Sequence, residues 1–304
     1  MTSAKYLIVI AGATAVGKTD LCVQIARDLK CDIISADSRQ FFKELSIGTA
    51  KPSVQEMQGV KHHFVDFIAI DQEFSAGKFE LEVLRLLPEL FRKNHLVLMT
   101  GGSGLYIQAV CQGMNDIPDV DIKFRKELYE ELEIHGLHML LEELKIKDPD
   151  YYNLVDKSNP QRIVRALEIC RGSGQPYSSF RTDERVNRDF KVIKIGIERE
   201  RDELFERINL RMDQMINDGL FEEVSQFNDK RHLNALKTVG YKEVFGYFDG
   251  DYDYEEAIRL LKRNTRRYAK RQLTWFKKDP EFTWFHPDEK DKIIKHIQRI
   301  VNCD

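Results

Sequence analysis

The stretch YLIVIAGATAVGKT, residues 6–19, decides how this chain folds. It ends in GATAVGKT, which has the spacing G-x-x-x-x-G-K-[ST] of a phosphate-binding loop. The glycines let the backbone approach a ligand closely, and the loop N–H groups, with the N-terminus of the following helix, attract an anion. Lys18 adds a positive charge, and the hydroxyl of Thr19 suits Mg²⁺. The apolar run before the loop and the helical spacing after it supply the context that this motif requires.

Four short apolar segments are expected to form strands. They are Tyr6–Ile10, Asp32–Ala36, His95–Thr100 and Lys191–Ile197. Each is apolar on both faces and alternates with helical segments, which indicates a parallel sheet covered by helices on both sides. We therefore predict an α/β fold, a P-loop NTPase-like doubly wound parallel sheet.

Helical patterns fill the chain between the third and fourth of these segments. FRKELYEELEIHGLHMLLEELKIKD and NPQRIVRALEICR have helical periodicity, and no convincing strand lies among them. We predict a helical insertion domain at 116–190, carried by a core domain made of 1–115 and 191–304. A long helix is expected near 255–278.

The composition is that of an ordinary globular protein. Of 304 residues 42% are hydrophobic, and 47 basic residues oppose 50 acidic ones, so a net charge of −3 predicts no general affinity for nucleic acid. No apolar run approaches the roughly 18 residues of a membrane span. The five cysteines lie far apart, without the spacing of a zinc site or a disulfide framework. We expect a cytoplasmic protein, with any basic site confined to one region.

No acidic residue follows the third apolar segment. NTPases of this fold usually have a second carboxylate at the end of a later strand, where it organises Mg²⁺ and water. Here HLVLMT runs into Gly101-Gly102-Ser103 instead. This departure favours a loop that holds a diphosphate over one that splits a γ-phosphate.

Two polar side chains follow the second and third segments, at the edge where ligands bind in doubly wound sheets. Asp37 fits a general base or a substrate acceptor, and it equally fits an N-cap of a following helix. Ser103 stands in GGSGLY, where the spacing alone favours a plain turn before a helix over a ligand contact.

A basic stripe lies in the segment AIRLLKRNTRRYAKRQLTWFKK, residues 257–278. The segment has nine basic residues and no acid. At helical spacing most of them fall on one half of the helix, which is interrupted by Leu260 and Leu273. Because the stripe contains no acid to pair with, we expect a polyanion partner, and this density of Arg and Lys suits a nucleic-acid backbone.

A series of motifs, in this order, resembles the bacterial tRNA dimethylallyltransferases, also called tRNA isopentenyltransferases, of the IPP transferase family. They are GATAVGKT, DSRQFFKELSIGTAKP, HHFVD, GGSGLY, NPQRIVRALE, VGYKE and KRNTRRYAKRQLTWF. The resemblance covers nearly the whole chain, and DS-x-Q, GTAKP and KRQ-x-TW are more specific than the phosphate loop. The chain departs from the family at Phe42, where a Tyr is common, and it lacks the C-terminal zinc finger of eukaryotic relatives.

The resemblance implies transfer of a dimethylallyl group from dimethylallyl diphosphate to N6 of the adenosine at tRNA position 37, in tRNAs that read codons beginning with U. Diphosphate leaves. Asp37 would be the general base, and Ser103 would contact the target nucleotide near the reacting atoms. Thr19 would hold Mg²⁺. The diphosphate would be bound by Gly12, Ala13, Thr14, Ala15, Val16, Gly17, Lys18, Thr19 and Arg211.

The implied partner is the anticodon stem-loop of tRNA, gripped by the helical insertion. The target base must leave its stack to be reached. By the resemblance, the tRNA contacts would be Asp37, Ser38, Arg39, Gln40, Ser103, Arg125, Gln161, Arg162, Ile163, Val164, Arg165, Lys270 and Arg271. We expect a monomer that does not bind a membrane.

Three other functions fit part of the sequence. A small-molecule or nucleotide kinase also combines a phosphate loop with an acid after the second strand, but no separate nucleoside-binding lid pattern is present. A non-catalytic RNA-binding module would not need Lys18, Thr19 and Asp37 together. An enzyme that prenylates free AMP or ADP would not need the basic stripe and the insertion.

Overall fold

The computed structural model describes residues 4–181 and 186–303. The chain forms two compact units, which we call the core unit (Met1–Gln112 with Asn187–Asp304) and the insertion unit (Gly113–Val186). The insertion predicted at 116–190 has nearly these bounds. Each unit has a hydrophobic core of its own.

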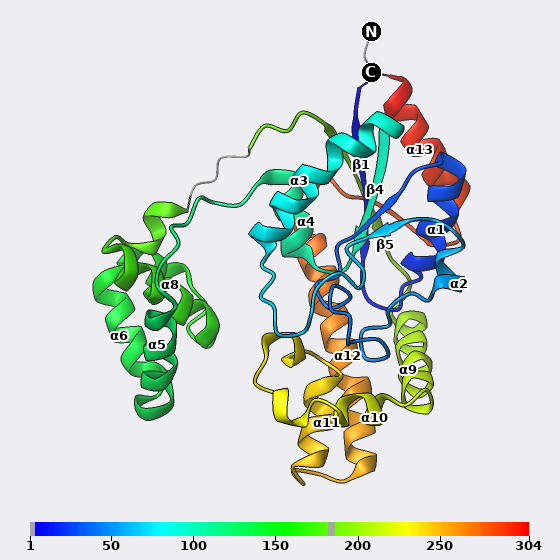
Figure 1. The fold of residues 1–304 in the computed structure, drawn as a ribbon. Helices are drawn as coiled ribbons and strands as arrows, with labels where there is room; N and C mark the ends of the chain where they lie inside the picture. The colour runs from blue at the N-terminus through cyan, green and yellow to red at the C-terminus, as the bar shows by residue number, and fades with distance from the viewer. Residues whose placement is uncertain (1–3, 182–185, 304) are drawn as a thin grey trace. The chain divides into compact units, whose positions relative to one another are not determined.

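A six-stranded parallel sheet forms the centre of the core unit (Figure 1). Its strands are β1 (Tyr6–Gly12), β2 (Ile33–Ser35), β3 (His62–His63), β4 (Leu96–Gly101), β5 (Lys191–Ile197) and β6 (Thr283–Phe285), in the order β3-β2-β4-β1-β5-β6. All neighbouring strands run parallel. The four predicted strands are confirmed, and the two short edge strands were not predicted.

The register of the sheet brings three loops to one edge. Thr100 near the end of β4 pairs with Ile10 of β1 on one side and with Ser35 of β2 on the other. The phosphate loop after β1, the turn after β2 and the turn after β4 therefore leave the sheet side by side, as expected at the carboxyl edge of an open α/β sheet.

Helices cover both faces of the sheet, as predicted. In Figure 1, α1 (Lys18–Leu29) and α13 (Lys290–Asn302) lie on one side of the strands, and α3 (Ala76–Lys93) and α4 (Gly104–Gln112) lie on the other. Alternate strand residues enter the two cores, as Ile8 and Leu7 do. The other core-unit helices are α2 (Val54–Met57), α9 (Arg201–Asn217), α10 (Leu220–Ser225), α11 (Tyr241–Phe248), α12 (Tyr254–Phe276) and the short 3₁₀ helices Asn228–Lys230 and Asn234–Leu236.

Among its described residues, all regular secondary structure of the insertion unit is helical. It contains α5 (Ile122–His135), α6 (Leu137–Lys147), α7 (Pro149–Leu154), α8 (Pro160–Ser173) and a 3₁₀ turn, Tyr177–Phe180. Its core is apolar, with two buried carboxylates, Asp148 and Glu168. Asp148 accepts hydrogen bonds from the N–H groups of Tyr151 (3.0 Å) and Ser178 (2.7 Å), which satisfies the buried charge and ties the 3₁₀ turn to α7.

Arg188 links the two places at which the chain leaves the core unit and re-enters it. Arg188, which follows the insertion, donates hydrogen bonds to the carbonyl oxygens of Val110 (3.0 Å) and Ala109 (2.9 Å) in α4, which precedes the insertion. Its guanidinium also pairs with Glu80 of α3 at 2.5 Å.

None of the described helices is both long and apolar enough to cross a membrane.

Candidate active site

The phosphate loop, Gly12–Thr19, is held in shape by hydrogen bonds to its carbonyl oxygens. Lys18 Nζ donates to Gly12 O (2.9 Å) and Ala13 O (2.7 Å). Arg207 Nε of α9 donates to Ala15 O (3.0 Å), and Arg199 Nε, just before that helix, donates to Val16 O (2.9 Å). The carbonyl groups are thus turned toward cations of the protein, which leaves the loop's N–H side for an anion.

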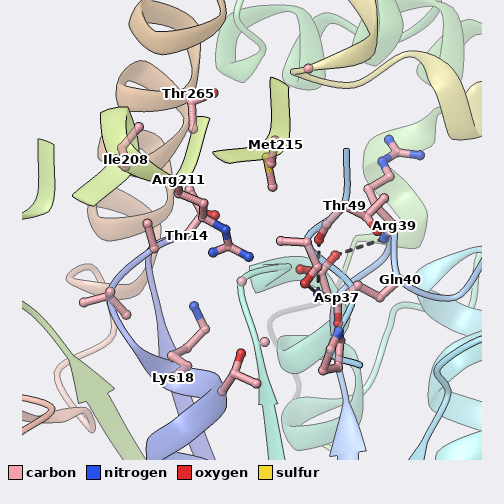
Figure 2. Close-up of a pocket in the computed structure, with 18 of the residues that line it drawn as sticks. Thr14, Lys18, Asp37, Arg39, Gln40, Thr49, Ile208, Arg211, Met215 and Thr265 are labelled. Atoms are coloured by element: carbon pink, nitrogen blue, oxygen red, sulfur yellow. Dashed lines mark hydrogen bonds between the residues drawn. The ribbon is translucent and has the colours of Figure 1, made fainter. Parts of the chain in front are cut away.

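A cavity of about 460 Å³ opens in front of this loop, entirely within the core unit. In Figure 2, Lys18 and Arg211 point into the same space from opposite sides, and Asp37 faces them from the wall formed after β2. The lining comes from the phosphate loop, the ends of β2 and β4, the 48–52 loop, α9 and α12. It includes Thr14, Lys18, Thr19, Asp37, Arg39, Gln40, Thr49, Thr100, Gly102, Arg207, Ile208, Arg211, Met215, Val239, Tyr268 and Gln272.

Four cations that line this cavity have no acidic partner among the described residues. They are Lys18, Arg39, Arg207 and Arg211, which form no ion pair. Burial lowers the pKa of Lys18 to about 8, although the nearby Asp37 carboxylate opposes that shift. Burial also lowers the pKa of Arg211, again opposed by Asp37. Unpaired positive charge removed from water favours binding of an anion, which would raise the pKa of both groups again.

Asp37 opens a tight turn and does not cap a helix. Its Oδ1 accepts a hydrogen bond from the N–H of Arg39 (3.0 Å), and its carbonyl accepts one from Gln40 (3.1 Å). Residues 38–41 form turns, so the N-cap interpretation was wrong. No described residue forms a hydrogen bond with the other carboxylate oxygen, Oδ2. The turn thus fixes the carboxylate and leaves one oxygen available at the cavity.

Ser103 supports this turn from the end of β4. Its Oγ accepts a hydrogen bond from the N–H of Ser38 (3.0 Å) and donates to Ser38 Oγ (3.1 Å). Ser103 is not among the residues that line the cavity. Its demonstrated contact is therefore with the residue after Asp37, and a contact with a nucleotide stays a prediction.

A partly buried carboxylate that sequence reasoning missed anchors the SIGTAKP loop. Glu223 of α10 accepts hydrogen bonds from the N–H groups of Ser46 (3.0 Å), Ile47 (2.7 Å) and Gly48 (2.9 Å). It also accepts one from the hydroxyl of Tyr241 at 2.6 Å, and burial raises the pKa of that phenol, so it remains a donor. The next residues of this loop line the cavity. Glu223 therefore helps to fix the shape of the cavity without lining it.

Replacing Glu223 by glutamine is expected to lower the free energy of unfolding by about 2–3 kcal/mol, because one amide oxygen cannot serve four donors and the amide NH₂ would face N–H groups. Chemical denaturation measures this loss, and hydrogen exchange at residues 46–52 should rise with it. The control is Glu222→Gln on the exposed face of the same helix. Equal stability of the two variants would contradict the anchoring role.

Thr100 stands near the end of β4, where NTPases of this fold usually have a second carboxylate. Its hydroxyl donates to the carbonyl oxygen of Ile10 (2.9 Å), and the thiol of Cys22 donates to it (3.2 Å). In the described part of the chain, no group of three or more His, Cys, Asp or Glu residues is placed to hold a metal ion. Thr100 thus offers a hydroxyl where NTPases of this fold usually have a carboxylate.

Comparison with known proteins decides the family. The family model described as IPP transferase matches residues 40–279. The chain belongs to the IPP transferase family.

Relatives of this IPP transferase match it over nearly their whole length. The protein named tRNA dimethylallyltransferase 1 of Bacteroides fragilis is 47% identical over 98% of this chain and 99% of its own. The tRNA dimethylallyltransferase of Cytophaga hutchinsonii is 51% identical over 97% of each chain. The predicted family resemblance is therefore confirmed.

Solved structures agree in fold with this IPP transferase. The tRNA isopentenylpyrophosphate transferase of Bacillus halodurans superimposes with a TM-score of 0.72 at 36% identity, over 98% of this chain and 97% of the other. A eukaryotic dimethylallyltransferase described as acting on tRNA gives a TM-score of 0.76 at 26% identity, over 90% and 70%. The P-loop NTPase-like fold is confirmed.

The predicted contacts on α8 of the IPP transferase divide into two sets. Ile163 and Val164 are buried in the core of the insertion unit, so the prediction that they contact tRNA is wrong for their side chains. Gln161 and Arg162 are exposed, at a helix start capped by Asn159.

Two other predicted contacts share a buried partner within the insertion unit. Arg125 and Arg165 both pair with the carboxylate of Glu168, at 3.0 and 2.9 Å. Glu168 is buried, whereas the side chains of Arg125 and Arg165 remain 35% and 40% exposed. A contact of these two arginines with RNA stays a prediction.

The basic stripe on α12 is partly neutralised, which corrects the argument that it has no acid to pair with. Arg259 pairs with Glu256 one turn earlier, and Lys262 pairs with Asp213 of α9, each at 2.5 Å. Among the described residues, Arg267, Lys270 and Arg271 have no ion pair, and all three are exposed. The unpaired positive charge of the stripe is thus concentrated on the half of α12 that reaches the cavity through Tyr268 and Gln272.

Proposed function

We propose that this IPP transferase transfers a dimethylallyl group from dimethylallyl diphosphate to N6 of a tRNA adenosine, at tRNA position 37 by the family resemblance. The supporting observation is one cavity in which a phosphate loop faces the Asp37 carboxylate, together with Lys18 and Arg211, which form no ion pair with any described residue. The names of the relatives support tRNA as the acceptor.

The proposed reaction assigns the two walls of the cavity to the two reactants. The lone pair of an exocyclic amine is delocalised into the ring, so N6 attacks poorly unless a base accepts its proton. Asp37 accepts that proton while the N6–C bond forms and the C–O bond to the diphosphate breaks. Lys18, Arg211 and the loop N–H groups stabilise the charge that develops on the departing diphosphate.

Apolar side chains next to the phosphate site suit the five-carbon chain of the donor. Ile208, Met212 and Met215 of α9, with Leu220 and Val239, contribute to the lining. A pocket that is mostly apolar around a few polar anchors is typical of small-molecule sites, and methionines adapt to irregular shapes.

Thr19 fits the Mg²⁺ that the sequence predicts. Its side chain lines the cavity beside Lys18, and no described residue forms a hydrogen bond with its hydroxyl. Mg²⁺ commonly uses few protein ligands together with phosphate oxygens and water, so the lack of an acidic cluster is compatible with it. When bound there, the ion would neutralise charge on the diphosphate.

The target adenosine must leave its stack to reach Asp37, at a cost of roughly a few kcal/mol. The exposed cations Arg267, Lys270 and Arg271 can offset this by binding the RNA backbone. We assign the residues that follow Asp37 (Ser38, Arg39 and Gln40) and the insertion unit to the same RNA, the anticodon stem-loop.

A mass measurement tests this function. The full chain is incubated with Mg²⁺, dimethylallyl diphosphate and an anticodon stem-loop that carries three adenosines around the target, and the RNA is weighed. We expect a gain of one C5 unit. No gain, together with phosphate transfer from ATP to a nucleoside or small molecule, would replace the proposal by a kinase.

The affinity for inorganic diphosphate is expected to fall as the pH rises through about 8, the pKa of Lys18 in the free chain. Only the ammonium form attracts the anion, so the loss approaches tenfold per pH unit above this pKa, and binding takes up protons there.

Without ligand, the effect of pH on the stability of the fold has the opposite sign. The native state binds this proton more weakly than the unfolded chain, so the destabilisation is full below pH 8 and fades toward the ordinary Lys pKa of 10.5.

Calorimetry in two buffers of different ionisation enthalpy measures the proton uptake. Lys18→Arg is the control, because its charge persists and its pH dependence reports only the ionisation of diphosphate itself. Identical pH profiles for the two proteins would contradict the assignment to Lys18.

A further inference from the structure

One side chain of α12 joins the two walls of the cavity. Gln272 Oε1 accepts a hydrogen bond from the N–H of Thr14 in the phosphate loop (2.9 Å), and its Nε2 donates to the carbonyl oxygen of Gly102 after β4 (2.9 Å). Gln272 is only 6% exposed. Its two partners fix the orientation of the amide, because a flipped amide would place NH₂ against N–H and C=O against C=O.

Glycines in the GGSG turn allow α12 to approach this closely. A Cβ on Gly102 would lie 2.2 Å from Gln272 Nε2, and one on Gly104 would lie 2.2 Å from the ring of Trp275. The GGSG and KRQ-x-TW motifs therefore pack against each other.

The same turn carries the residues that hold Asp37. Ser103 follows Gly102 directly, and its N–H donates to the carbonyl oxygen of Ala36 (3.3 Å) while its Oγ bonds to Ser38. A continuous path of hydrogen bonds thus runs from Thr14 through Gln272 and the turn after β4 to both neighbours of Asp37.

The sheet alone cannot provide this link directly. The phosphate loop follows β1 and Asp37 follows β2, and these strands are not neighbours, because β4 lies between them. Beyond the strand ends, Gln272 connects the loop of β1 to the turn of β4.

We propose that Gln272 is a positioning residue that fixes the separation between the phosphate loop and the Asp37 turn. This inference rests on the proposed function, in which the leaving diphosphate and the base must be aligned on one reacting adenosine. A misplacement of about 1 Å between reacting groups can lower the rate by about 10²-fold. Gln272 need not touch either substrate to have this effect.

The kinetic test uses Gln272→Met, which keeps the length of the side chain and removes both hydrogen bonds. We expect kcat of C5 transfer to fall by about 10²-fold, with both KM values within about threefold of wild type. Combining Gln272→Met with Ser103→Ala should add little, because both act through one turn. Gln108→Met, an exposed glutamine of α4, is the matched control. An unchanged kcat, or fully additive losses, would overturn the proposal.

Hydrogen exchange on the full chain tests the same inference without any turnover. In Gln272→Met, exchange should rise together at 12–19 and at 36–40, whereas a role local to the loop would raise it at 12–19 alone and would overturn the proposal. If the wild type transfers no C5 group, the proposed function fails and this measurement still decides on Gln272. Should Gln272→Met not fold, Gln272→Glu keeps the acceptor for Thr14 and replaces the donor for Gly102 by an oxygen that repels the Gly102 carbonyl, and exchange should then rise at 36–40.

Discussion

Replacing Asp37 by asparagine is expected to lower kcat of prenyl transfer by about 10³-fold. The amide keeps the shape of the side chain and can still accept the hydrogen bond from Arg39, so the turn should persist. It cannot take the proton from N6. Because the lost negative charge faces Lys18 and Arg211, the affinity for inorganic diphosphate should stay the same or increase.

Single-turnover mass analysis of the RNA measures the rate, and calorimetry measures the diphosphate affinity. Asp32→Asn is the control, since Asp32 lies just before the same strand, bonds to His63 at 2.9 Å and does not line the cavity. If Asp37→Asn kept a rate within tenfold of wild type, the Asp37 carboxylate would not be the general base.

Replacing Lys18 by methionine is expected to lower kcat by at least about 10²-fold, as the loss of one preorganised donor to a developing charge commonly does. The affinity for inorganic diphosphate should fall with it. Stability should change little, because the loss of the two hydrogen bonds to Gly12 O and Ala13 O is offset by relief from burying the ammonium, which is unfavourable, as its lowered pKa indicates. We expect the Tm to stay within about 3 °C of wild type.

Binding calorimetry and thermal unfolding on the same samples separate the two effects. Lys43→Met is the control, since Lys43 is exposed and lies away from the cavity. A variant that binds diphosphate normally would contradict the role of Lys18, and a large drop in Tm would mean that Lys18 is mainly structural.

The segments that could be predicted are those whose sequence carries its own local signal. The strand β1, the phosphate loop and α1 combine a continuous apolar run, two spaced glycines and a helical period, which no tertiary contact has to supply. The edge strands β3 and β6 have two and three residues and no such pattern. They exist because β2 and β5 offer them hydrogen-bonding partners, and that information lies far away in the chain.

The site was predictable to the extent that its residues stand in motifs. Lys18 and Asp37 were placed by motif and strand end, and both face the cavity. Arg207 and Glu223 were missed because their roles depend on Ala15 and on the 46–48 backbone, which only the fold brings near them. Gln272 lies in the KRQ-x-TW motif, but no role could be predicted for it, because its spacing in a helix does not reveal what packs against it.

The clamp of Arg188 on the end of α4 makes the insertion a cassette. The chain leaves and re-enters the core unit at one corner, where residues 110 and 188 are within hydrogen-bonding distance. A short linker in place of residues 113–186 would therefore close a small loop, and loop-closure entropy changes only slowly with length. That segment can therefore be exchanged for another one without altering the order of the strands in the sheet.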